Sequence, residues 1–143
     1  MGGLRTYVIG LFVCLSTYLS TGAASAGTDM FPRSPSERVQ VFAMCAGRYS
    51  ALEEHQRFFD GAASEQAGSI RAEFESLIDA AMPDAVDWGM PQRMALDWRV
   101  TAKAAQAQLL HSGTFATNSR RQQVDRQASE SFFAECRAMI GRT

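Results

Sequence analysis

Two cysteines constrain the fold of this chain more than any other feature. Cys45 and Cys136 lie 91 residues apart, and each falls on a line of apolar residues with the spacing of one helix face. The third cysteine, Cys14, lies in an N-terminal segment that is expected to be removed on export, and the even number that remains favours a disulfide. In the chain-entropy model, a loop of this length contributes about 4–5 kcal/mol to stability. The alternatives are two buried thiols or a metal site, although the close cysteine spacing of structural zinc sites is absent.

The first two helical segments are bounded by proline, glycine and a capping motif. Residues 34–37 read Ser-Pro-Ser-Glu, a capping box with proline at the first helical position. We expect this first helix to carry an apolar stripe as far as Phe59 and to end before Gly61. The second helix is expected over residues 64–82. Pro83 should end it, because proline disfavours the helical conformation in the residue before it.

The last two helical segments follow the connector of residues 83–90. Pro91 is expected to open the third helix, and Gly113 follows its last periodic apolar residues. The fourth helix should start near Asn118, a good capping residue, and stop at Gly141. No segment alternates with period two. We therefore predict an all-α fold, a small up-down four-helix bundle or a close variant, with one disulfide joining its first and fourth helices.

Small residues predict close helix contacts. Gly47 lies inside the first helix, where glycine costs about 1 kcal/mol relative to alanine. We expect it to let a neighbouring helix approach. The third helix is thin on part of its surface because it carries Ala102, Ala104, Ala105 and Ala107.

The N-terminal segment resembles an export signal. Arg5 precedes an apolar stretch, and Ala24-Ser25-Ala26 fits the A-x-A cleavage pattern. We expect residues 1–26 to be a cleaved signal peptide and residues 27–143 to form a single helical domain. The mature protein is then expected either in the periplasm or outside the cell. The alternative is a membrane anchor over residues 6–28, because about 20 apolar residues span a bilayer. Serine and threonine in the second half of the segment weaken that alternative.

Composition and motifs exclude several functional classes. The net charge is −1, so bulk charge predicts no nucleic-acid partner. The sequence contains none of the nucleophile-elbow, zinc-protease, P-loop or dinucleotide motifs. The acidic residues are expected on solvated helix faces. A non-enzymatic protein is favoured, with an enzyme of unrecognised site as the alternative.

His55 and His111 are the candidate metal ligands. They fall on the first and third helices, so a bundle can bring them together as haem or copper ligands. The competing interpretation is two ordinary histidines on the surface or at helix ends. Because no C-x-x-C-H motif is present, covalent haem attachment is excluded. We expect no cofactor and no metal.

Candidate partner contacts lie between helices. Trp88 and Met90 occupy a short connector, where they either fold down as a lid or form an exposed apolar anchor. Phe115 is expected in the next loop. Arg120 and Arg121 begin the fourth helix, where positive charge opposes the helix dipole and an acidic partner would relieve the conflict.

The competing interpretation of these arginines is a solvated first turn, in which Arg121 pairs with Asp125 one turn later. Together these features predict an exported, non-enzymatic binding or accessory protein whose partner is another protein in the periplasm or at the membrane surface. The alternatives are a small subunit of a membrane complex, held by an uncleaved N-terminal helix, and a haem- or copper-binding bundle.

Overall fold

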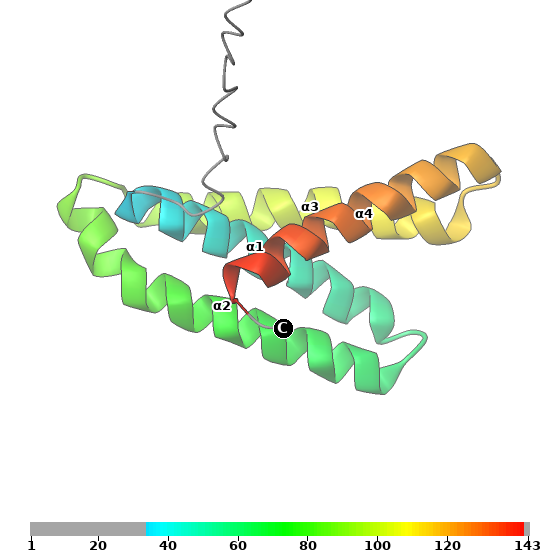
Figure 1. Ribbon diagram of the computed structural model, residues 1–143, viewed down its shortest axis with the longest axis horizontal. Helices are drawn as coiled ribbons and strands as arrows, with labels where there is room; N and C mark the ends of the chain where they lie inside the picture. Colours follow the sequence, from blue (N-terminus) through cyan, green and yellow to red (C-terminus); the bar gives the residue numbers. More distant parts are fainter. Residues whose placement is uncertain (1–33, 142–143) are drawn as a thin grey trace, which may run out of the picture.

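The computed structural model describes residues 34–141, which form four α-helices and no strand. The helices are α1 (Pro35–Gln56), α2 (Gly61–Asp87), α3 (Arg93–Phe115) and α4 (Ser119–Met139). Successive helices run in opposite directions (Figure 1), so the predicted all-α, up-down bundle is confirmed. The predicted signal segment and the alternative anchor lie outside the described residues. Within residues 34–141, no helix is both long and apolar enough to cross a membrane.

Helix α1 is the centre of the fold. It packs along both α2 and α3, and α4 lies against α3 and crosses α1 (Figure 1). In the described part of the chain, the backbone of α2 approaches only that of α1. The molecule is thus a close variant of a four-helix bundle. Three helices pack around α1, whereas in a regular bundle the four helices lie at the corners of a square.

The core is built from aromatic and small residues. The Tyr49 ring of α1 lies 6.0 Å from the Phe74 ring of α2 and 5.2 Å from the Phe133 ring of α4. Ring pairs at these distances contribute beyond the area they bury. Alanines and the half-cystines fill the spaces between the rings. The fully buried apolar residues include Val39, Ala43, Ala46, Phe74, Ala85 and Cys136.

A disulfide between Cys45 and Cys136 joins α1 to α4, with the two Cα atoms 5.6 Å apart. Both cysteines are buried. The predicted pairing is confirmed, and it lies where α4 crosses α1.

Gly47 brings α1 and α3 into contact through their backbones. A Cβ atom at residue 47 would overlap the carbonyl oxygen of Arg99 and lie 3.0 Å from the backbone nitrogen of Lys103. The expectation of a close helix approach at Gly47 is confirmed.

The predicted boundary between the first two helices is wrong. Helix α1 ends at Gln56, and Asp60 caps α2 by accepting a hydrogen bond from the Ala63 backbone at 3.0 Å. Gly61 therefore begins α2 rather than terminating α1. As a consequence, Phe59 leaves the buried stripe of α1 and is exposed.

Pro83 does not end α2, which continues to Asp87. A proline removes only its own hydrogen bond and crowds the turn before it. The turn after Pro83 buries Ala85 completely, and the Trp88 backbone donates to the Asp84 carbonyl at 3.1 Å. Burial of that last turn outweighs the local preference of proline.

The predicted bounds of α3 are wrong, since Pro91 lies before the helix rather than opening it, whereas those of α4 are confirmed. Helix α3 begins at Arg93 and passes through Gly113 to Phe115, so Gly113 is not a stop and Phe115 is the last residue of a helix rather than part of a loop. Asn118 caps α4 by accepting from the Arg121 backbone at 3.0 Å, as predicted. Gly141 follows α4 with a φ of 57°, the left-handed conformation expected at a helix stop.

Candidate binding surfaces

The predicted contact residues lie at opposite ends of the bundle. Trp88 and Met90 belong to the turn between α2 and α3, whereas Phe115, Arg120 and Arg121 lie around the turn between α3 and α4. The 23 residues of α3 separate the two groups, which corresponds to about 35 Å at 1.5 Å per residue. The two groups therefore cannot form one continuous contact surface.

The turn between α2 and α3 divides its two large residues between core and solvent. Met90 is 6% exposed and packs into the core, and its backbone nitrogen donates to the Ala85 carbonyl at 2.9 Å. Trp88 is 74% exposed. Gly89 has a φ of 89°, which turns the chain between them. The lid interpretation thus describes Met90, and the exposed-anchor interpretation describes Trp88.

Aromatic rings gather at the opposite end of the molecule. The rings of His55 and Phe59 lie 5.1 Å apart, those of Phe59 and Phe115 6.2 Å, and those of Phe115 and His111 5.0 Å. Phe58 precedes Phe59 in the sequence and is 83% exposed. Phe59 and Phe115 are each more than half exposed. We call these five residues the aromatic end.

Sequence reasoning found only part of the aromatic end. Phe115 was singled out as a partner contact, and the two histidines as metal ligands, but Phe58 and Phe59 were missed. The signal in the sequence that could have identified these two residues is that they are adjacent. Neighbouring helical residues point about 100° apart, so Phe58 and Phe59 cannot share one buried stripe.

His55 and His111 both lie at the aromatic end, where His55 packs against Phe59 and His111 against Phe115. The pKa of His55 is lowered, first by burial and then by the nearby charge of His111. Its Nε2 atom lies 3.2 Å from the Thr114 hydroxyl. Across residues 34–141, no three His, Cys, Asp or Glu side chains are grouped so that they could hold a metal ion.

The arginines at the start of α4 are exposed. The Nε atom of Arg121 lies 3.5 Å from an Asp125 carboxylate oxygen, the predicted pairing one turn apart. The same carboxylate accepts a hydrogen bond from Ser112 of α3. Asp125 therefore links α3 and α4 as well as compensating one arginine.

Three acidic residues of α1 and α2 form ion pairs with basic residues of α2 and α3. The Arg71 guanidinium lies 2.9 Å from Glu53 and 2.8 Å from Glu75, and these carboxylates raise its pKa. Arg99 reaches the same Glu75 at 2.5 Å. Lys103 pairs with Glu54 at 2.6 Å. The network connects α1, α2 and α3 through their solvent-facing sides.

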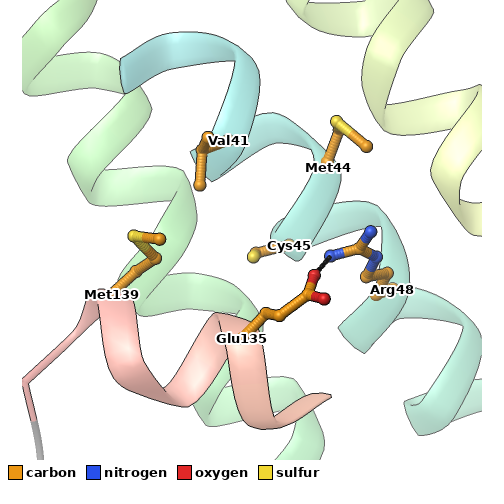
Figure 2. Close-up of a pocket in the computed structure, with 6 residues that line it drawn as sticks. All are labelled: Val41, Met44, Cys45, Arg48, Glu135 and Met139. Atoms are coloured by element: carbon orange, nitrogen blue, oxygen red, sulfur yellow. Dashed lines mark ion pairs between the residues drawn. The ribbon is translucent and has the colours of Figure 1, made fainter. Parts of the chain in front are cut away.

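A hollow of about 330 Å³ lies beside the disulfide, between α1 and α4. Arg48 of α1 and Glu135 of α4 point toward each other across it (Figure 2), at 3.6 Å. The guanidinium lies over the Phe132 ring, 4.2 Å from its centroid, and donates to the Cys136 sulfur at 3.6 Å. Burial lowers the pKa of Arg48, and the charge of Glu135 opposes that effect. The apolar lining residues are Val41, Met44, Cys45 and Met139.

No protein-family model matches the chain, and no curated protein or solved structure is significantly similar to it.

Proposed function

We propose that the protein is an exported, non-enzymatic accessory protein that binds another protein of the periplasm or membrane surface through the aromatic end. The observation that carries this proposal is the ring contact between two exposed phenylalanines, Phe59 after α1 and Phe115 at the end of α3, with the exposed Phe58 next to Phe59 in the chain. Phe58 and Phe59 follow α1, and Phe115 ends α3.

The exposed rings support a protein contact because aromatic residues are enriched at the energetic centres of interfaces. Each exposed phenylalanine leaves apolar area in water, and a partner would remove that area at about 25 cal/mol per Å². The flanking histidines add hydrogen-bonding groups beside the apolar surface. Trp88, at the opposite end, is exposed but forms no ring pair with another residue of the described part of the chain.

Two features support export. The A-x-A pattern at residues 24–26 follows an apolar stretch. The Cys45–Cys136 disulfide suits an oxidising compartment, because cytosolic thiols are kept reduced. The intact mass of the protein isolated from its own host tests cleavage directly. A chain starting at Gly27 supports the proposal, whereas a full-length chain found only in membranes supports the membrane-subunit alternative.

Cross-linking in the host tests the contact surface. We expect wild type to yield a discrete cross-linked species whose partner is identified by mass spectrometry. The F58S/F59S/F115S variant should lose that species, because its apolar contact area is removed. The matched control is W88S, which removes one exposed ring at the opposite end and should retain the species. If W88S loses the partner while the triple variant retains it, the aromatic end is not the interface.

A haem- or copper-binding bundle is the second candidate, favoured by the position of His55 and His111 at the two ends of one chain of ring contacts. Elemental analysis and absorption spectra of protein purified natively from its host test it. Stoichiometric metal that is absent from an H55A/H111A variant would support this candidate over the first. If the wild-type protein is colourless and contains no metal, the haem- or copper-binding candidate is excluded and the protein-binding proposal stands.

A further inference from the structure

One side of α3 is exposed and mainly apolar along most of the helix. Its residues recur at intervals of 4, 4, 3, 4 and 4, so they lie along one helix face. They are Leu96, Val100, Ala104, Ala107, His111 and Phe115, and all are exposed. The residues that α3 buries lie on the opposite side of the helix. We call the six exposed residues the α3 stripe.

The α3 stripe has the same order of side-chain sizes in both directions. Large apolar residues, Leu96 and Phe115, lie at its ends, and two alanines lie at its centre. Two antiparallel copies of α3 would therefore form three kinds of contact, each made twice: Leu96 with Phe115, Val100 with His111, and Ala104 with Ala107. A twofold interface requires such self-complementarity, because the same surface serves in both copies. The central alanines allow the two helices to approach closely.

The charges at the two ends of α3 favour the antiparallel arrangement. Residues 84–97, around the start of α3, carry three aspartates and one arginine, whereas residues 111–126, around its end, carry three arginines and one aspartate. An antiparallel pair sets the acidic end of each copy beside the basic end of the other. A parallel pair would bring like charges together, which costs affinity.

We propose that the α3 stripe is a homodimer interface through which two copies of the chain pack antiparallel. The face is about 28 Å long and about 10 Å wide, which is small beside the roughly 800 Å² that each partner buries in a stable complex. We therefore expect a weak dimer, with a Kd on the order of 10–100 μM.

The dimer goes beyond the protein contact proposed for the aromatic end and does not depend on it. The two surfaces share His111 and Phe115. Phe58 and Phe59 belong to the aromatic end alone, and the part of the stripe from Leu96 to Ala107 belongs to α3 alone. Variants at the unshared residues therefore separate the two proposals.

Sedimentation equilibrium of the protein purified from its own host tests the dimer over about 5–300 μM, a range that brackets the expected Kd. The average mass should rise from near monomer to mostly dimer. A104E places a charge at the centre of the interface and should weaken association at least about tenfold, while glutamate is still a good helix former. The matched control is A134E, the same change at an exposed alanine of α4, which should dimerise like wild type. A monomeric wild type, or unchanged association of A104E, would overturn the proposal.

Cysteine cross-linking tests the antiparallel arrangement. An antiparallel pair places residue 100 of one copy beside residue 111 of the other, but leaves the two copies of residue 100 about 16 Å apart along the helix axis. Mild oxidation should therefore link V100C to H111C in a mixture of the two variants, and link V100C to itself far less. Equal or preferential linking of V100C to itself would contradict the antiparallel pair.

Cross-linking in the host distinguishes the dimer from the contact at the aromatic end. A104E should lose the dimer and keep the cross-linked partner, whereas F58S/F59S should keep the dimer and lose that partner. If wild type is monomeric and A104E loses the partner, the α3 stripe binds that other protein and the homodimer is wrong.

Discussion

Among the described residues, two glycines face the backbone of a neighbouring helix, and these two glycines are not equivalent. At Gly47, the backbone of α3 lies so close to α1 that no side-chain carbon fits. At Gly113, a Cβ atom would lie 3.4 Å from the Arg126 backbone nitrogen of α4, which is ordinary van der Waals contact. Glycine is therefore a steric requirement between α1 and α3 but not between α3 and α4.

The difference indicates how the fold is held together. Helices α1, α2 and α3 are joined by close packing around α1 and by the ion pairs of Arg71 and Arg99. Helix α4 buries only Ser129, Phe133 and Cys136 within its length. Its attachment to α1 depends mainly on the disulfide and the Tyr49–Phe133 ring contact. We infer that α1, α2 and α3 form the packed core and that the disulfide fastens α4 onto this core.

Removing the disulfide should have the largest effect on stability. We expect C45A/C136A to lose about 3–4 kcal/mol, because the closed loop is long and the two alanines leave a cavity. Urea unfolding followed by circular dichroism measures the loss. Wild type under reducing conditions serves as the control and should behave similarly. A loss below about 1 kcal/mol in both would mean that α4 is held by packing.

Gly47→Ala should break the tighter of the two glycine contacts. The new methyl group overlaps the Arg99 carbonyl, so α1 and α3 must separate, at a cost of about 2–3 kcal/mol even after the helical preference of alanine. The midpoint of urea unfolding should fall accordingly. Wild-type stability of G47A would show that the two helices are not in backbone contact.

Gly113→Ala provides the matched comparison within α3. Here the methyl group fits, and alanine favours the helix, so we expect a change between zero and a gain of about 1 kcal/mol. The same unfolding measurement applies. If G113A is as destabilised as G47A, the contrast between the two contacts is wrong.

The histidines give the smallest and most local test of the α1–α3 contact. The pKa of His55 is lowered in the folded protein, so protonation of His55 favours the unfolded chain. The contribution of neutral His55 to stability is therefore complete above pH 6.5, and it is lost as the pH falls from about 6.5 toward the pKa of the folded state. Because His111 contributes by repulsion, H111Q should raise the pKa of His55, as measured by NMR titration. No change would place the two rings beyond electrostatic reach.

Local signals in the sequence accounted for most of the fold. The Ser34 capping box, the Asn118 cap and the Gly141 stop each depend on a few neighbouring residues, and all are present. The passage of α2 through Pro83 could not be predicted locally, because it depends on burial of Ala85 by other helices. The central position of α1 likewise follows from contacts that no single segment specifies.

The candidate sites were less predictable than the fold. The burial of Arg48 could not be predicted from the sequence, because it depends on Phe132 and Glu135, which lie more than 80 residues away in the chain. Gln106 carries no sequence pattern that marks a buried polar side chain. Phe58 and Phe59 were missed because the end of α1 was placed three residues too late. Each omission concerns an environment created by packing.

The attachment of α4 by the disulfide is tested most directly by hydrogen exchange. Protection of each helix is compared between the oxidised and the reduced wild-type protein. Reduction should lower protection first in α4, residues 119–139, while amides in the middle of α1 and α3 keep most of theirs. Simultaneous loss in all four helices, or earlier loss in α1, would contradict a packed α1–α3 core with α4 fastened by the disulfide.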